Sequence, residues 1–218
     1  LLYQPKYFEL ESSINIPLKI EGKDDFYTRD QLLVTGKLNG ERIHFIVAHW
    51  PSRRGGEKKS EPLRKAAAAL GKKIIDSIQE KDPEAKVIYM GDLNDDPVDE
   101  SLKKVMHDKH KKSQVEEDDL FNAMYDFYKK GIGTLAYRDN WNLFDQILMT
   151  PPLISEGLDS YKFYKAFIFN KTFLLQQDGK YKGYPWRSYG GPNYIGGYSD
   201  HFPVYVFLVK EVSNTSMK

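Results

Sequence analysis

Three short polar segments of the sequence carry residue types that serve acid–base chemistry, and each lies at the end of an apolar, β-rich run. The first is His49-Trp50-Pro51-Ser52-Arg53, which follows the apolar residues 43–47. Ser52 and Arg53 place a hydroxyl and a guanidinium group near the histidine, where they could hold an oxyanion such as phosphate. A lone histidine at a strand end is otherwise most often an inert core residue, so these neighbours are what indicates a site.

The second segment is Gly91-Asp92-Leu93-Asn94, which follows a short apolar run. In an extended chain Asp92 and Asn94 would project to one side, while Leu93 anchors the other. A carboxylate and a carboxamide side by side provide a proton acceptor and an amide donor. The alternative is an acidic turn that simply ends a strand, because Asp, Asn and Pro are common in turns.

The third segment is Ser199-Asp200-His201, which precedes the last β-rich run. Adjacent side chains of an extended chain point to opposite sides, so Asp200 and His201 need different partners. Asp145, which is embedded in the apolar residues 143–148, is a candidate partner for His201, since a buried carboxylate requires a hydrogen-bonded or cationic neighbour. A carboxylate that orients and stabilises a protonated histidine is common in general acid–base sites.

Composition narrows the classes of function. The 218 residues are enough for one α/β domain, and we expect a single core. Lys and Arg total 32 against 31 Asp and Glu, so any affinity for nucleic acid or an anionic membrane must come from a local patch. The absence of cysteine excludes disulfides, thiolate metal sites and thiol nucleophiles. No apolar run approaches the roughly 18 to 20 residues that a membrane span needs.

The flanking sequence predicts the elements that would position these segments. Residues 31–38 and 42–49 are β-rich and are joined by Asn39-Gly40, a dipeptide that suits a two-residue hairpin turn. Residues 60–81 repeat apolar side chains at helical spacing, and residues 86–90 form a short apolar strand. This order predicts a strand–helix–strand crossover that covers one face of a sheet.

The rest of the chain is predicted to be helical at first and then mainly β. Residues 98–130 are predicted to be helical and surface-exposed, with a highly charged middle, residues 107–119, that is typical of a solvated loop. Residues 181–198 are predicted to form a long loop rich in Gly, Tyr and Pro. The aromatic side chains of this loop could stack on bases or line a lipid-facing groove, although packing over the sheet is the favoured interpretation. The later β-rich runs are residues 134–137, 141–149, 161–169 and 203–210.

These segments together resemble a known superfamily. Residues 91–97 are similar to the Gly-Asp-Phe-Asn motif of the endonuclease/exonuclease/phosphatase (deoxyribonuclease I-like) superfamily, and residues 199–204 to its terminal Ser-Asp-His motif. Phe144-Asp145-Gln146-Ile147 resembles the aspartate-bearing strand between them, and the His49 segment resembles the histidine strand of the deoxyribonuclease and sphingomyelinase branches. The four matches occur in the family's order, so the match is specific.

The resemblance implies a fold, a cofactor and a set of site residues. The implied fold is an α/β, two-layer β-sandwich flanked by helices, with the active site at the strand ends on one rim. A divalent metal, Mg²⁺ or Mn²⁺, would neutralise phosphate charge while water attacks phosphorus in line. The matched positions give six catalytic residues, which are His49, Asp92, Asn94, Asp145, Asp200 and His201.

The resemblance also assigns roles. His201, paired with Asp145, would be the general base or a phosphate-contacting imidazolium, and His49 would lie near the leaving group. Asp92 would position or deprotonate the water or protonate the leaving oxygen, and Asn94 would donate to a phosphate oxygen. Asp200 would orient His201 or touch a second metal. Three residues are expected to contact the substrate phosphate, namely Ser52, Arg53 and Arg29, although Arg29 could equally be an ordinary surface arginine.

Two family motifs are not found in residues 1–218, an Asn-bearing strand and a later strand whose Glu is the principal metal ligand. Residues 1–8 resemble the strand that follows this glutamate, so we expect the chain to be one domain that lacks about its first third. The alternative is a divergent protein that has lost the metal site. A fragment should have little metal-dependent activity, and its exposed sheet edges invite self-association.

The function expected from these observations is that of a phosphodiesterase or nuclease that acts on a phosphodiester substrate such as nucleic acid. The alternatives are a catalytically silent binding module on the same fold and a sugar or inositol phosphate monoesterase. The His-Trp-Pro-Ser-Arg segment is associated with bacterial, often exported, members. Export would require a signal peptide ahead of residue 1.

Overall fold

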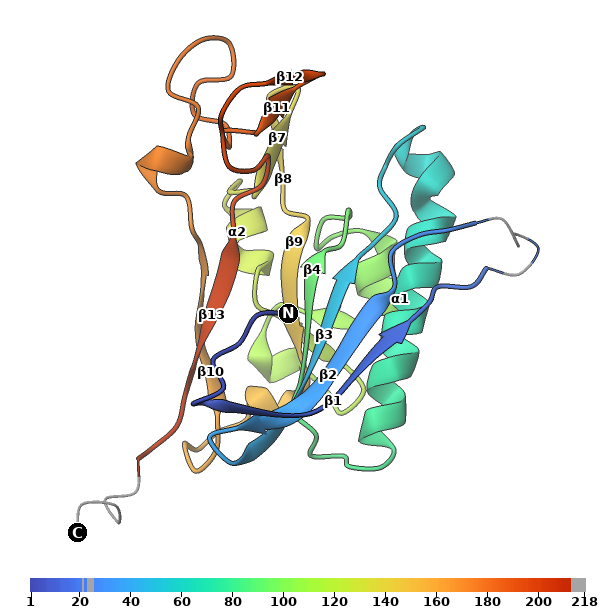
Figure 1. Cartoon of the computed structure of the whole chain (residues 1–218). Coiled ribbons are helices and arrows are strands. Elements are labelled where there is room, and N and C mark those ends of the chain that lie inside the picture. Colours follow the sequence, from blue (N-terminus) through green and yellow to red (C-terminus); the bar gives the residue numbers. More distant parts are fainter. Residues whose placement is uncertain (21, 23–25, 213–218) are drawn as a thin grey trace.

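Seven strands form the main sheet in the computed structural model, which describes residues 1–20, 22 and 26–212 (Figure 1). Their order across the sheet is β1-β2-β3-β4-β9-β6-β5. The strands are β1 (Phe8–Ile16), β2 (Gln31–Leu38), β3 (Glu41–His49), β4 (Val87–Asp92), β5 (Asp108–Lys109), β6 (Leu120–Asn122) and β9 (Asp145–Met149).

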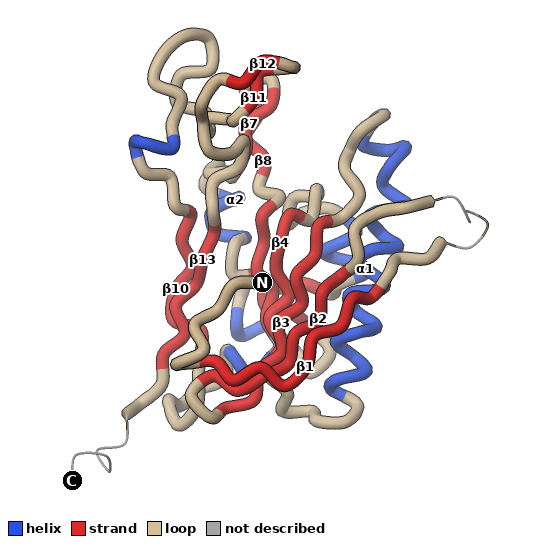
Figure 2. Tube along the Cα trace, viewed as in Figure 1, coloured by secondary structure: helices blue, strands red, loops and turns tan. Residues whose placement is uncertain are grey.

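A second, two-stranded layer packs on one face of this sheet. It consists of β10 (Lys162–Ile168) and β13 (Val204–Val209), which pair antiparallel (Figure 2). Ala166, Val206 and Leu208 of this layer share one apolar core with Val34 and Ile147 of the main sheet. The β-sandwich expected from the sequence is therefore confirmed.

Two short hairpins and several helical segments complete the described residues. The hairpins, β7 (Leu135–Tyr137) with β8 (Asn140–Asn142) and β11 (Tyr189–Gly190) with β12 (Asn193–Tyr194), stand together beyond one end of the sandwich (Figure 1). The helices are α1 (Glu57–Gln79) and α2 (Tyr125–Lys129), and the single turns cover Ser101–Val105, Lys112–Gln114, Pro151–Leu153 and Thr172–Leu174. None of the described helices is long and apolar enough to cross a membrane.

The predicted hairpin is confirmed in its position and its turn. Strands β2 and β3 pair antiparallel from Leu38 opposite Glu41 to Leu32 opposite Val47. Asn39 and Gly40 both have positive φ, 47° and 85°, as a two-residue turn of the primed type requires. The turn fixes the register of β3, and with it the level at which His49 leaves the sheet.

The predicted crossover is also confirmed. Helix α1 begins three residues earlier than the sequence suggested and connects β3 to β4, which lie parallel. Its apolar face, which includes Ala67, Ala68 and Ile75, packs on the main sheet against Ile46 and Tyr89. Because parallel strands have their carboxyl ends at the same edge, the segments after β3 and β4 meet on one rim.

The prediction for residues 98–130 is wrong, since they do not form an exposed helix. The segment folds into two helical turns, the short strands β5 and β6, and α2. Leu102, Met106 and Leu120 are fully buried against α1 and β4, and Asp108 is buried as well. The apolar residues of this segment are widely spaced among charged ones and come together only in the tertiary fold, so no local periodicity predicted their burial.

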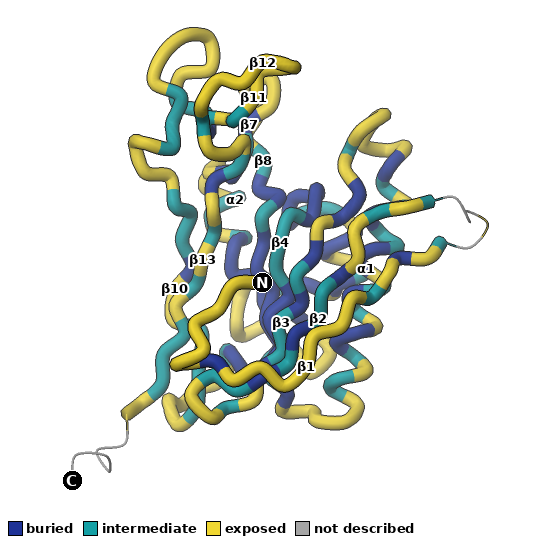
Figure 3. The backbone as a smooth tube through the Cα atoms, viewed as in Figure 1, coloured by how far each residue is buried: buried dark blue, intermediate teal, exposed yellow. Residues whose placement is uncertain are grey.

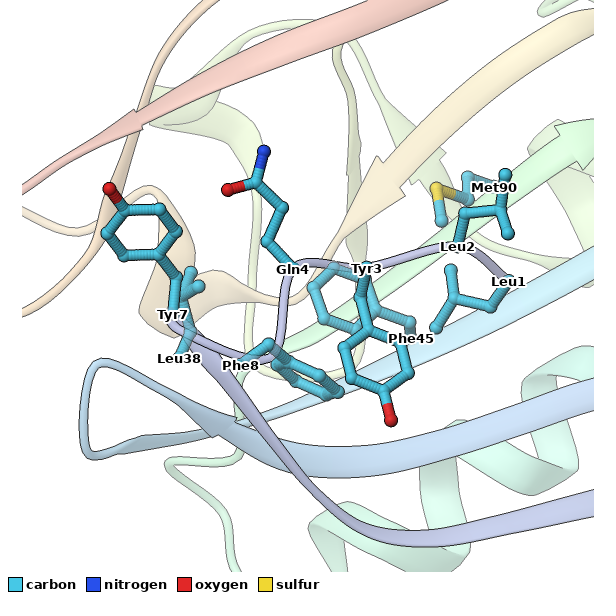
Figure 4. A pocket seen from close by; sticks show the side chains of 9 residues that line it. All are labelled: Leu1, Leu2, Tyr3, Gln4, Tyr7, Phe8, Leu38, Phe45 and Met90. Carbon is cyan, nitrogen blue, oxygen red and sulfur yellow. The ribbon is translucent and has the colours of Figure 1, made fainter.

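The segment before β1 crosses the face of the main sheet that is opposite α1 (Figure 4). Residues 1–8 were expected to resemble a strand, but residues 1–7 form no strand and β1 begins only at Phe8. An apolar pocket of about 420 Å³ opens beneath the segment, and it contains none of the predicted site residues. Its lining residues are Leu1, Leu2, Tyr3, Gln4, Tyr7, Phe8, Leu38, Phe45 and Met90.

Candidate active site

Three of the predicted site residues lie in one row across the main sheet. His49, the last residue of β3, pairs with Asp92 at the end of β4, and Asp92 pairs with Asp145 at the start of β9. Cross-strand partners project from the same face of a sheet, so the three side chains converge. The Nε2 atom of His49 lies 3.2 Å from Oδ2 of Asp92.

Local packing holds this row in place. Trp50, directly after His49, is buried and donates its indole N–H to the Tyr89 hydroxyl at 2.6 Å. Gly91 has a φ of 142° and runs beside Ala48, where a Cβ would lie 1.8 Å from the Ala48 carbonyl oxygen. A residue with a side chain could not occupy this position, so glycine is what allows β4 to deliver Asp92 beside β3.

His201 reaches the row from the segment that leads into β13, three residues before that strand begins. Its Nδ1 atom lies 2.6 Å from Oδ2 of Asp145, and this confirms the pairing that the sequence predicted. Burial lowers the pKa of His201, but the hydrogen bond and the charge of Asp145, together with Asp92 and Asp200, outweigh burial and raise that pKa above its ordinary value. His49, Asp92, Asp145 and His201 are hereafter the strand-end cluster.

The pKa values of the two histidines in the strand-end cluster are shifted in opposite directions. Burial, together with the charges of Arg29 and His201, lowers the pKa of His49 despite the neighbouring Asp92. Burial and the nearby Asp145 raise the pKa of Asp92. The cluster therefore combines an imidazole that holds its proton more tightly than usual, an imidazole that holds it less tightly, and a carboxylate that accepts a proton more readily than an ordinary aspartate.

Asn94 does not project beside Asp92 as an extended chain would require. Its φ of 52° is left-handed, and its backbone N–H donates to Oδ1 of Asp92 at 3.0 Å. Its buried side-chain amide donates to the Trp50 carbonyl oxygen at 3.0 Å. Leu93 is fully buried, so the expected anchor is present. The extended conformation expected for this segment is therefore wrong, and a turn, the alternative kept in the sequence analysis, is observed, with Asp92 accepting a hydrogen bond from within it.

Arg53 is held by carboxylates through one of its guanidinium nitrogens. Its Nη2 atom lies 2.7 Å from Oδ2 of Asp99 and 3.2 Å from Oδ1 of Asp95, and the guanidinium group stacks over the Phe144 ring at 4.5 Å. These contacts compete with a phosphate for this nitrogen, and the phosphate contact of Arg53 stays a prediction. Ser52 is exposed, and its hydroxyl accepts the backbone N–H of Arg54 at 3.4 Å, so it belongs to the loop after His49.

A buried ion pair beneath the strand-end cluster was missed in the sequence. Arg64 of α1 is 1% exposed and donates to Oδ1 of Asp95 at 2.5 Å, while the Ser101 hydroxyl donates to Oδ2 of Asp95 at 2.6 Å. Arg64 lies three and four residues before Ala67 and Ala68 on the apolar face of the helix. That position was the available signal, because an arginine on a buried face needs a counter-charge.

Arg29 and Asp200 lie at the edge of the strand-end cluster. Arg29 donates to the carbonyl oxygens of His49 at 3.3 Å and of Trp50 at 3.1 Å, so it is tied to the main chain beside the site. Asp200 is exposed, and its charge contributes to the raised pKa of His201. Both predicted roles of Asp200, orienting His201 and touching a second metal, stay predictions.

The described residues do not form a complete metal site. Residues 1–20, 22 and 26–212 contain no group of three or more His, Asp or Glu side chains arranged to hold an ion. In the strand-end cluster, Asp92 accepts the Asn94 N–H and contacts His49, and Asp145 contacts His201. These residues could contribute oxygen atoms to an ion, but they do not enclose one.

Comparison with known proteins identifies the family to which this chain belongs. A sequence profile of the Endonuclease/Exonuclease/phosphatase family matches residues 1–210, so this chain belongs to that family of phosphoester-hydrolysing enzymes. The resemblance found in the motifs is thereby confirmed. Members of this family generally use divalent metals. No curated protein sequence matches this chain.

Solved structures share the fold at low sequence identity. Truncated Caenorhabditis elegans TDP2 is 17% identical with a TM-score of 0.58, and 91% of this chain covers 65% of it. A Bacteroides thetaiotaomicron mannosyl-6-phosphatase is 18% identical with a TM-score of 0.57, covering 95% and 69% of the two chains. Danio rerio TDP2 in complex with a single-strand DNA product is 12% identical with a TM-score of 0.55, covering 93% and 69%. The chain spans about two thirds of these proteins, and 51% of another C. elegans TDP2 chain.

Proposed function

We propose that this chain forms the larger part of the catalytic domain of a divalent-metal-dependent phosphodiesterase. The observation that carries the proposal is the strand-end cluster, in which two imidazole–carboxylate pairs from both layers converge on one rim. Asp92 lies 3.2 Å from His49, and Asp145 lies 2.6 Å from His201. A packing role alone would not require two such pairs within one row of a sheet.

The pKa directions support a division of labour. Asp92, whose pKa burial raises, accepts a proton from the water that attacks phosphorus. Asp145 accepts the Nδ1–H of His201 and raises its pKa, which favours the imidazolium, and the Nε2–H can donate to a phosphate oxygen or to the leaving oxygen as the P–O bond breaks. His49 stays neutral and fixes the orientation of Asp92.

A divalent ion, Mg²⁺ or Mn²⁺, would supply charge neutralisation at the phosphate. The described residues do not enclose an ion. Its remaining ligands would therefore come from chain outside residues 1–218. This proposal agrees with the chain spanning only about two thirds of its structural relatives. A catalytically silent module remains the alternative if the longer protein also lacks such ligands.

Two of the structurally similar proteins support different substrates for this chain. The TDP2 structure with a single-strand DNA product supports a phosphodiester of nucleic acid, which is our first proposal. The mannosyl-6-phosphatase supports a sugar phosphate monoester as the second candidate. The net charge of +1 gives no general attraction to duplex DNA, so recognition of a polynucleotide needs a local surface.

The test is hydrolysis of bis(p-nitrophenyl) phosphate, plasmid DNA and mannose 6-phosphate with Mg²⁺, Mn²⁺ or EDTA. We would compare the 218-residue chain, the longer protein, and the longer protein carrying His201→Ala or the control His110→Ala. His110 stacks on Tyr125, away from the strand-end cluster. EDTA-sensitive diester hydrolysis that His201→Ala reduces about 10²- to 10⁴-fold, and His110→Ala leaves unchanged, supports the proposal. An inert longer protein, or one that cleaves only the monoester, contradicts it.

A further inference from the structure

A row of aromatic rings leads away from the strand-end cluster. Phe202, directly after His201, stacks with Trp141 at 6.0 Å between ring centroids. Trp141 contacts Tyr184 at 5.8 Å, and Tyr184 contacts Tyr181 at 5.6 Å. We call these four residues the aromatic row. It begins at the site and runs into the loop of residues 169–198, so a bound chain that passes through the site can follow it.

The four rings of the row differ in exposure, and Tyr184, which lies between Trp141 and Tyr181, is only partly exposed. Phe202 is buried, Trp141 is 38% exposed and Tyr181 is 55% exposed. The surrounding segment, residues 169–198, is mostly exposed, with partly buried residues interspersed (Figure 3). Tyr189, Tyr194 and other aromatic side chains nearby are also largely exposed, although they touch one another. Packing over the sheet, the favoured interpretation of the sequence, therefore accounts for the inner end of the row and leaves the outer rings open.

The backbone holds this loop in a defined shape. The Trp186 carbonyl oxygen accepts the N–H groups of Tyr198 and Ser199 at 2.7 and 3.2 Å, and Trp186 N–H donates to the Leu174 carbonyl at 2.7 Å. A Cβ on Gly197 would lie 2.1 Å from the Trp186 carbonyl oxygen, so this close crossing requires glycine. The rings are thus presented on a fixed surface, which lowers the entropic cost of binding.

The charge of the loop complements a polyanion. Residues 169–198 contain four cationic side chains and one carboxylate, Asp178, whereas the whole chain has a net charge of only +1. Lys180 lies over the Tyr181 ring at 5.6 Å, and Arg138 lies over the Tyr137 ring at 5.2 Å. Flat rings beside cations match a chain that alternates flat bases with phosphates.

We propose that the aromatic row is a subsite for a single-stranded polynucleotide, in which Trp141 and Tyr181 stack on successive unpaired bases. The inference rests on the proposed function, because it places the bases beside a phosphodiester bound at the strand-end cluster. A lipid surface is the less suitable partner, since the exposed rings are mainly tyrosines flanked by lysines. Interfacial anchors instead combine Trp, Phe and Leu into one apolar face.

The test is equilibrium binding of a fluorescein-labelled oligothymidylate to the 218-residue chain in EDTA, so that no hydrolysis is involved. Trp141→Ala and Tyr181→Ala should each weaken binding about 5- to 100-fold. Trp141→Phe and Tyr181→Phe should retain it. Tyr164→Ala is the matched control, because Tyr164 is an exposed tyrosine on β10, outside the row. Circular dichroism would confirm that each variant is folded.

Two further probes separate the causes of binding. An abasic strand of equal length should bind weakly, and its affinity should not depend on Trp141 or Tyr181. Unchanged oligothymidylate binding by both alanine variants would overturn the inference. So would a loss confined to cosedimentation with phosphatidylcholine–phosphatidylglycerol vesicles, which would identify a lipid surface. If binding depends on the row but the longer protein hydrolyses no phosphodiester, the proposed function fails while the subsite stands. If the longer protein hydrolyses a phosphodiester but binding does not depend on the row, the subsite fails while the proposed function stands.

Discussion

Removal of either partner of the buried Arg64–Asp95 pair should destabilise the fold strongly. Removal of both should cost much less stability than the sum of the two single losses. The two side chains are 1% and 2% exposed and lie 2.5 Å apart. Breaking a buried ion pair by deletion of one partner typically costs about 3–5 kcal/mol, because an uncompensated charge stays buried. The pair also supports the loop that carries Asp92 and Asn94.

The remaining contacts set where each variant falls in that range. After Arg64→Met, Asp95 keeps the Ser101 hydroxyl at 2.6 Å and Arg53 at 3.2 Å, so a loss of about 3 kcal/mol is expected. After Asp95→Asn, Arg64 keeps only neutral acceptors, the Ser60 hydroxyl and the Glu57 carbonyl, and the loss should approach about 5 kcal/mol.

A double-mutant cycle by urea unfolding of the 218-residue chain measures the coupling. Because the double variant buries no unpaired charge, the coupling energy should reach about 2–3 kcal/mol. Arg54→Met is the control, since Arg54 is exposed and should change stability by less than about 0.5 kcal/mol. If the two single losses simply add, or if Asp95→Asn costs less than about 1 kcal/mol, the two side chains do not stabilise each other as argued.

Three other predictions concern pH and the backbone. Burial raises the pKa of Asp108 from 3.8 to about 6, so its contribution to stability is fully present below pH 3.8 and falls by about 3 kcal/mol as pH rises through 6. Asp108→Asn should remove this dependence from urea-unfolding curves at several pH values, whereas the exposed Asp118→Asn should leave it. Asp145→Asn should lower the pKa of His201 in the metal-free chain, because the hydrogen bond and the negative charge that raise this pKa are lost. An unchanged imidazole titration by NMR would refute the pairing. Gly91→Ala should destabilise the fold by more than about 2 kcal/mol in thermal or urea unfolding, since its Cβ would overlap a main-chain oxygen of β3.

Local periodicity was sufficient to predict the elements that carry the site. The Asn39-Gly40 turn, the apolar spacing of α1 and the short apolar strand before Gly91 each identify one element without tertiary information. The order of these elements then implied a parallel crossover. The convergence of the polar segments on one rim was implied by the family resemblance rather than by the order of the elements alone.

Details that depend on distant charges could not be predicted from local sequence. Arg53 is a reasonable phosphate contact by its distance from His49, but its contacts with Asp95 and Asp99, more than forty residues later, could not be predicted. Nothing near Arg53 in the sequence indicates which carboxylates fold back onto it. Asn94 shows the same limit at short range, because one hydrogen bond from its backbone to Asp92 replaces the extended conformation with a turn.

The strand-end cluster depends on how the two layers sit against each other. No backbone ladder joins β10 and β13 to the main sheet among the described residues, so apolar packing and side-chain contacts set the position of His201. At the opposite end of the sandwich, Glu41 of β3 binds Lys210 at 2.8 Å and the Tyr161 N–H at 3.0 Å. The Asp145–His201 pair is the corresponding contact at the active rim. A shift of the second layer would therefore separate His201 from Asp145 before it disturbed the row formed by His49, Asp92 and Asp145, so the titration of His201 reports directly on the packing between the layers.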